Sequence, residues 1–169
     1  MSEIIIEANT AYIKEPDFTT KIKKALALLK SKDATNYAII TTYIGKIRAS
    51  NKSGANFNET IMTIDIAEAT FNASLCWLAS VLVHEATHIQ KYKVSGKKYG
   101  GAYTMTDKKL ALKTMIDEEL ECNKVQLIAL GKIGGTAHET TYLKGLKGDH
   151  FDVDKDGDYD IHDYEARSY

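Results

Sequence analysis

Two histidines and a glutamate stand in the HExxH order at His84, Glu85 and His88. On a helix, residues four apart lie on one face about one turn apart, so both imidazoles can reach one metal ion while Glu85 stands beside it. The pattern lies in an apolar run, 78–89, that is typical of a buried helix. Chance predicts roughly 0.008 such matches for this composition. The segment therefore predicts zinc-assisted hydrolytic chemistry, with His84 and His88 as ligands and Glu85 as the catalytic base.

A catalytic zinc ion usually takes three protein ligands, so a third is expected elsewhere in the chain. The stretch 107–130 predicts a long helix whose apolar face includes Glu119, Asn123 and Gln126. An ionised carboxylate on a buried face is costly unless it is paired or binds a metal. Glu119 is therefore the predicted third ligand. The alternatives are that it pairs with a buried Lys or Arg, or that this helix is more exposed.

Counting 100° of rotation per residue along this helix predicts different positions for three neighbours of Glu119. Glu118 and Glu121 project about 100° and 160° away from Glu119, toward the expected solvent side. Asn123 lies one turn after Glu119 on the same face. It either orients a histidine ring by hydrogen bonding, behind the ligands, or fills the cleft without any role at the metal.

These two motifs resemble the zincin metallopeptidases of the glutamate-zincin type. The matching segments are His84–His88 and Glu119–Asn123, where many members carry E-x-x-x-D and this chain ends on asparagine. The three-histidine pattern HExxHxxGxxH is excluded, because Lys91 and Val94 occupy its later positions. The resemblance implies an α+β zincin-like fold, with a small antiparallel or mixed sheet packed on the HExxH helix and a second ligand-bearing helix. It also implies that Thr60–Ile66 is an edge strand along which an extended substrate lies.

The last twenty residues carry a second metal pattern, because Asp152–Asp163 matches the EF-hand calcium loop with Gly157 at its sharp turn. The predicted calcium ligands are Asp152, Asp154, Asp156, Asp158, Asp160 and Asp163. Aspartates so close together repel one another without a cation, although a disordered acidic tail is the alternative. The loop resembles the dockerin type, with Asp at position 12, but Tyr159 stands at position 8 and no second loop exists. It is expected to pin the tail onto the preceding domain or to dock another protein.

The surrounding sequence predicts the elements that position these residues. A helix is expected over Phe18–Lys32, strands in Tyr37–Arg48 and Thr60–Ile66, and a hairpin or longer turn over Asn51–Asn58. The predicted helices that follow are a central one over Ser74–Lys91, a long one from a capping Thr106 to near Gly131, and a short one whose Thr136 and Glu139 form a capping box.

Composition sets the remaining limits. A chain of 169 residues, 44% apolar and 27% charged, suits one main domain over 1–148 with the calcium loop, 149–169, packed on it. The formal net charge of −1 disfavours nucleic acid as a partner. No signal peptide or membrane span is recognisable, so the compartment stays open between the cytoplasm and export without a cleaved signal. Cys76 and Cys122 are expected to be buried free thiols.

Three functions fit these patterns. The first is a zinc metallopeptidase acting on a protein or peptide substrate, with a secreted effector or toxin domain as its setting. The second is a calcium-dependent protein-binding module with a structural zinc site, and the third is a zinc hydrolase of a non-peptide cell-wall amide. For a peptidase, the side chains that could stabilise the oxyanion are Tyr92, Tyr99, Tyr103 and Tyr142.

Overall fold

The structure is a computed structural model that describes residues 3–14, 16–57, 60–95 and 105–166. Its strands are β1 (Ile5–Glu7), β2 (Lys46–Ala49), β3 (Gly54–Asn56) and β4 (Thr63–Ile66). Its helices are α1 (Asp17–Lys32), α2 (Ala34–Tyr43), α3 (Glu68–Asn72), α4 (Leu75–Ser95), α5 (Lys108–Ile133), α6 (Ala137–Gly145) and α7 (Ile161–Ala166), with a 3₁₀ turn, η2 (Asp149–Phe151). The fold is of the expected α+β class.

The described strands form one four-stranded mixed sheet in the order β1-β2-β4-β3. Strands β1, β2 and β4 are parallel, and β3 runs antiparallel to β4 with Ala55 opposite Ile64. The strand predicted over Thr60–Ile66 is confirmed at Thr63–Ile66, but its expected edge position is wrong. It is an inner strand, and β3 forms the edge because the chain folds back after β2 and pairs on the outer side of β4.

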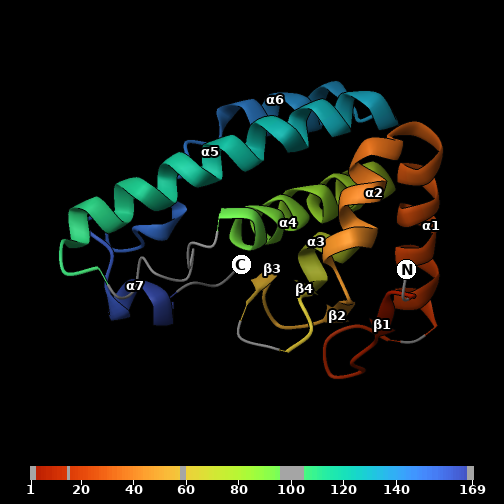
Figure 1. Ribbon diagram of the computed structural model, residues 1–169, viewed down its shortest axis with the longest axis horizontal. Coiled ribbons are helices and arrows are strands. Elements are labelled where there is room, and N and C mark those ends of the chain that lie inside the picture. The colour runs from red at the N-terminus through yellow and green to blue at the C-terminus, as the bar shows by residue number, and fades with distance from the viewer. Residues whose placement is uncertain (1–2, 15, 58–59, 96–104, 167–169) are drawn as a thin grey trace.

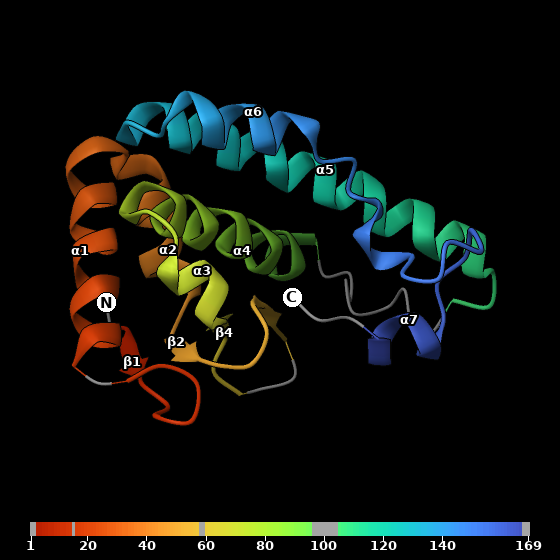
Figure 2. The same cartoon turned by 180° about the vertical axis from the view of Figure 1, so that it is seen from behind.

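Helix α4 is the central element of the molecule, as its apolar sequence predicts. It packs against α1, α2 and α5 and also contacts β3 and β4. Figure 1 shows α4 between the sheet and the layer formed by α5 and α6, and Figure 2 shows the same arrangement from behind. Leu78, Leu82, Ala86 and Ile89 are fully buried along it. A helix covered on several sides holds its polar side chains in fixed positions.

The prediction of strand structure over Tyr37–Arg48 is wrong for most of that stretch. Residues 34–43 form α2, and only Lys46–Ala49 is a strand. Helix α2 packs on α4 with Ile40 fully buried, so tertiary packing outweighs the local preference of its β-branched and aromatic residues. The turn predicted over Asn51–Asn58 likewise contains a strand, β3.

Capping residues mark both ends of α5 and the start of α6. Helix α5 begins at Lys108 with Asp107, not Thr106, as its N-cap, because the Asp107 side chain accepts from Leu110 N at 3.0 Å. It ends at Ile133, slightly beyond the predicted end, where Gly134 takes the left-handed conformation with φ 88°. The capping box of Thr136 and Glu139 at the start of α6 is confirmed.

Two further expectations about the whole chain concern its cysteines and membrane spans. Cys76 and Cys122 are free thiols, of which Cys122 is buried and Cys76 partly buried. Within the described ranges, no helix combines the length and the hydropathy that crossing a bilayer requires.

The sheet and α4 share one core, which a single truncation should test. Ile64 lies on the inner strand β4 and is fully buried, whereas Ile128 on α5 is 59% exposed. Ile64→Ala is expected to lower the free energy of unfolding by about 2–5 kcal/mol, because it removes buried methyl groups and leaves a cavity. Ile128→Ala, the matched control, should change it by less than about 0.5 kcal/mol. Urea titration followed by circular dichroism measures both values, and equal effects would contradict the described packing.

Candidate metal centre

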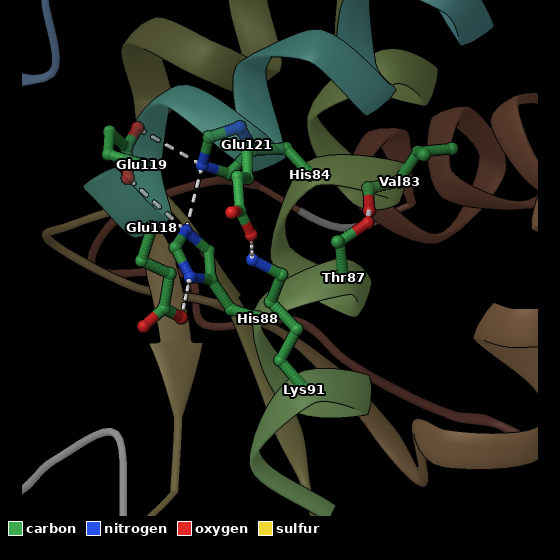
Figure 3. Close-up of polar contacts among 8 residues, drawn as sticks. All are labelled: Val83, His84, Thr87, His88, Lys91, Glu118, Glu119 and Glu121. Carbon is green, nitrogen blue, oxygen red and sulfur yellow. Dashed lines mark hydrogen bonds and ion pairs between the residues drawn. The ribbon is translucent and has the colours of Figure 1, made fainter. Parts of the chain in front are cut away.

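Three side chains from two helices converge at the interface of α4 and α5. His84 Nε2 and His88 Nε2 lie 3.0 Å apart on α4. The carboxylate of Glu119, on α5, spans them: Oε1 is 3.2 Å from His84 Nε2 and Oε2 is 3.2 Å from His88 Nε2. Figure 3 shows the two rings pointing at the same carboxylate. The structure thus brings together the three residues predicted as zinc ligands.

The spacing of these atoms suits a small tetrahedral ion. Zinc binds histidine nitrogen and carboxylate oxygen at about 2.0–2.2 Å, which places ligand atoms about 3.3 Å apart at the corners of a tetrahedron. Here the two Nε2 atoms lie 3.0 Å apart, and each lies 3.2 Å from a different oxygen of the Glu119 carboxylate. Two histidines and one glutamate are also a donor set of catalytic zinc sites that leave a fourth position open. The chemistry of the donors therefore fits zinc, and the separation of the two histidine nitrogens is close to the one expected between two zinc ligands.

Glu119 faces the histidines because α4 and α5 pack along their length in opposite directions. Gln126 Nε2 donates to Ser80 Oγ at 3.2 Å further along the same interface. Glu119 is 7% exposed, as its place on the apolar face predicts. Its hydrogen-bond partners in the described structure are the two histidines rather than a lysine or arginine.

The charges at this interface favour the ionised form of Glu119. Burial by itself raises the pKa of Glu119, but the neighbouring His84 and His88 hold it far below its ordinary value. Burial likewise lowers the pKa of His88, while hydrogen bonds with Cys122, Glu118 and Glu119 outweigh it and raise the pKa well above the ordinary value. Glu119 therefore stays ionised, which is the form that binds a metal, whereas His88 would have to release its proton to bind one.

Glu85 stands beside this cluster, and with His84 and His88 it forms a group whose possible ligand atoms lie within 4.8 Å of one another. Burial raises the pKa of its carboxyl group, and the charges of His84 and His88 reduce that effect. A backbone hydrogen bond from Ala55, on the edge strand β3, also favours its ionised form. The pKa of Glu85 is thus raised at a position next to the two histidines.

The prediction that Glu118 faces solvent is wrong. The Glu118 side chain is 10% exposed, and its Oε1 lies 2.7 Å from His88 Nδ1. A glutamate side chain is long enough to reach around the helix at this close interface, so a 100° offset from Glu119 does not carry it into water. Glu121 does face solvent, with 61% of its side chain exposed, and pairs with Lys91. Figure 3 shows both contacts.

Glu118 contacts Nδ1 of His88, and Glu119 contacts Nε2 on the other side of the same ring. A carboxylate that accepts the outer N–H of a ligating histidine fixes the ring and makes its inner nitrogen a better donor to metal. Cys122 and Glu118 also group around His88, with ligand atoms within 4.8 Å of one another. His88, Glu118 and Cys122 are thus themselves a group that could hold a metal ion, and Glu118 Oε1 contacts the His88 ring at 2.7 Å.

Asn123 has the predicted position without the predicted contact. It is 7% exposed and lines the same cleft as His84. In the described part of the chain its Nδ2 has no hydrogen-bond partner, and the same holds for the buried His84 Nδ1. The role of Asn123 in orienting a histidine therefore stays a prediction.

A cleft of about 930 Å³ opens onto the cluster. Its lining includes the edge strand β3 on one side and α5 on the other. The cleft continues along α4 to Trp77, whose ring packs edge-on against Tyr142 of α6 with centroids 5.6 Å apart. Among the tyrosines proposed for the oxyanion, Tyr142 lines the cleft and Tyr92 packs on Phe57. Tyr99 and Tyr103 lie outside the described residues.

Two residues that line this cleft were not singled out from the sequence. His150 and Phe151, in η2, lie beside it just before the predicted calcium loop. The sequence could have pointed to them by their position between helix α6, which begins with a capping box, and the predicted calcium loop. A segment that is fixed at both ends can take few positions. Figures 1 and 2 show this C-terminal segment beside the N-terminal half of α5.

The C-terminal loop has several geometric features of an EF-hand. Gly157 takes φ 86° at the predicted turn, and α7 begins at Ile161, within the last turn of the loop. Side-chain oxygens accept backbone N–H groups inside the loop, with Gly157 N donating to Asp152 at 3.2 Å and Val153 N donating to Asp163 at 2.7 Å. These bonds close the loop from its first to its twelfth position.

The six predicted calcium ligands divide into two sets. Asp152, Asp154 and Asp163 bring ligand oxygens within 4.8 Å of one another. The other three, Asp156, Asp158 and Asp160, are not part of that group. Asp152 is 9% exposed, and its Oδ1 is buried with no hydrogen-bond partner in the described structure. A buried carboxylate oxygen that lacks a donor fits a bound cation.

Comparisons of the chain with protein-family models, with curated proteins and with solved structures found no match. Both metal clusters are therefore interpreted from their own residues and distances.

Removal of the third ligand should separate the predicted site from its neighbours. Purified protein is expected to hold about one zinc ion per chain. Glu119→Ala should lose that zinc, because two imidazoles alone do not close the site, while Glu121→Ala, the exposed control, should keep it. Elemental analysis after dialysis gives the ratio. Zinc retained by Glu119→Ala would show that the three-residue cluster does not bind it.

The contact between Glu118 and His88 yields a graded prediction. Glu118→Gln keeps a hydrogen-bond acceptor but removes the charge, so zinc affinity should fall about 10–100-fold. Glu121→Gln, three residues along the same helix, should leave it unchanged. Competition with a chromophoric chelator measures both dissociation constants, and equal affinities would mean that Glu118 does not act on the metal.

Proposed function

We propose that this protein is a zinc-dependent metallopeptidase. The observation that carries the proposal is the convergence of His84, His88 and Glu119, with ligand atoms 3.0–3.2 Å apart, at a cleft that Glu85 also lines. Structural zinc sites are usually closed by four protein ligands, whereas three ligands facing a large cleft leave room for water and substrate. This favours a hydrolase over a binding module with a structural zinc.

The residues of the chain divide the work of hydrolysis among them. His84, His88 and Glu119 would hold the metal, which when bound supplies a more acidic water and a polarised substrate carbonyl. Glu85 accepts a proton from the attacking water and delivers it to the leaving amine. Ala55 N–H keeps the Glu85 carboxylate in place, and Glu118 keeps the His88 ring in place. The protein thus prepares both the ligands and the base before substrate binds.

The position of β3 favours a peptide over a cell-wall amide. An extended peptide can add to the free edge of a sheet through backbone hydrogen bonds. Strand β3 is the edge strand, and it lines the cleft next to Glu85. A substrate strand laid along β3 would pass beside Glu85, which the N–H of Ala55 already contacts, and beside the two histidines. The cleft volume of about 930 Å³ is ample for several residues.

We infer in addition that the C-terminal loop binds calcium. Carboxylate oxygens are the ligands that calcium prefers, and Asp152, Asp154 and Asp163 supply three that lie close together. The buried, unpartnered oxygen of Asp152 supports this assignment. The cation would neutralise the mutual repulsion of the aspartates and fix the tail.

The Glu85→Gln variant tests the peptidase proposal. The exchange keeps the size of the side chain but removes the base, so turnover should fall by about 10²–10⁴-fold while zinc content stays at the wild-type level. Glu121→Gln is the matched control and should keep full turnover. The assay is proteomic identification of new peptide termini after incubation of a cell lysate with each protein.

This assay decides between outcomes without knowledge of the natural substrate. New termini that appear with wild type and Glu121→Gln, and disappear with Glu85→Gln, would support the proposal. Zinc-loaded wild type that generates the same termini as Glu85→Gln would overturn it.

A further inference from the structure

A short stretch, residues 148–151, joins the metal cluster to the calcium loop, and we call it the bridge segment. Its first residue, Gly148, has φ 72° and packs closely on α5. A Cβ at this position would lie 3.1 Å from the backbone oxygen of Ile116 and 3.3 Å from Cβ of Glu119. The bridge segment therefore begins close to a predicted zinc ligand, at a place where both the φ angle and the tight packing favour glycine.

The other end of the bridge segment packs on the calcium loop. The ring of Phe151 lies edge-on to that of Tyr159, with centroids 6.3 Å apart and an interplanar angle of 87°. Tyr159 is fully buried although it stands at position 8 of the loop, where EF-hand pairs place a residue facing a second loop. In this chain that residue packs on the bridge segment instead. The next residue after Phe151 is Asp152, the first of the loop.

Between these two contacts the bridge segment lines the cleft. His150 and Phe151 pack on each other, with ring centroids 4.2 Å apart, and both face the cleft that holds His84 and Glu119. One side of the substrate cleft is thus built from residues whose position depends on Gly148 at one end and on the loop at the other.

The loop cannot hold this position by its own charges. Asp152 and Asp163 are 9% and 2% exposed, and Asp154 brings a third carboxylate oxygen within 4.8 Å of theirs. Carboxylates buried so close together repel one another and cost free energy unless a cation lies among them. Asp152 Oδ1, buried without a partner, is an independent sign that a ligand belongs there. A cation among these carboxylates would remove their repulsion and favour the arrangement in which Tyr159 packs against Phe151.

We propose that calcium binding at Asp152, Asp154 and Asp163 assembles the side of the zinc cleft formed by His150 and Phe151. Calcium thereby controls whether the cleft is complete, while the zinc ligands themselves remain on α4 and α5. The proposed coupling between the calcium loop and the cleft rests on the proposed function only for the identity of the molecule that the cleft binds. The chain of contacts from the loop to Glu119 exists whatever the substrate is.

Hydrogen exchange detects this coupling without an activity assay. Full-length protein is loaded with zinc and compared in calcium-depleted buffer and with calcium at about 1 mM. Calcium should slow backbone exchange in 146–151 by at least about tenfold in the wild type, because the bridge segment becomes fixed on α5. Asp154→Ala, which removes the side-chain oxygens of an exposed member of the calcium group, should abolish this protection. Asp17→Ala, on the distant helix α1, should retain it.

A second pair of variants separates the bridge segment from the loop. Gly148→Ala introduces a Cβ against Ile116 and Glu119, so calcium should still bind the loop by calorimetry but no longer protect 146–151. Gly134→Ala has a comparable left-handed φ of 88° but nothing within 4 Å, so it controls for backbone strain alone. It should keep the protection.

Each outcome decides the proposal. Absence of calcium binding, protection confined to 152–166, or protection that survives in Gly148→Ala would overturn it. Protection of 146–151 that both Asp154→Ala and Gly148→Ala abolish would support it, even if the protein proved to hold no zinc and the peptidase proposal failed. Where lysate cleavage is seen, calcium should raise its rate without changing zinc content.

Discussion

The carboxylate of Glu119 is a negative charge at the interface of two packed helices, with only 7% of the residue exposed. Such a group is tolerated only with partners of opposite charge or a metal, and here both histidines of α4 face it. This requirement fixes the rotation of α5 about its own axis. Once Glu119 points at α4, Glu118 meets the outer nitrogen of His88 and Gln126 meets Ser80. The polar contacts of the interface thus follow from one buried charge.

Helix α4 connects this interface to the sheet. Its histidines face α5, while Glu85, the next residue after His84, is reached by the backbone of Ala55 on β3. Successive residues on a helix differ by about 100° in direction, so neighbours in the sequence serve opposite sides of the cleft. Glu85 is therefore held by the edge strand, and the two histidines contact the second helix. Because α4 is covered on several sides, it holds Glu85 and the two histidines in fixed positions relative to one another.

Local patterns predicted the residues of the site better than the sheet around it. The HExxH spacing and the apolar face of α5 identified the converging side chains, because helical periodicity depends only on the sequence nearby. The strand predicted in Tyr37–Arg48 is mostly a helix, and the edge position belongs to β3 rather than to Thr63–Ile66. Pairing order depends on contacts between distant segments, which periodicity does not contain. The role of Glu118 was missed for a related reason, since the reach of a long side chain depends on how closely the helices approach.

Trp77 is the one tryptophan of the chain, and it lines the cleft on α4 two turns before His84. Seven residues of helix place it about 10 Å along the axis from that histidine. Its indole packs on Tyr142 at the apolar end of the same cleft. The molecule thus has its single tryptophan, beside ten tyrosines in the whole chain, at the place where a substrate or a metal would change the surroundings of the indole. Its emission reports on this cleft alone, with no background from tryptophans elsewhere.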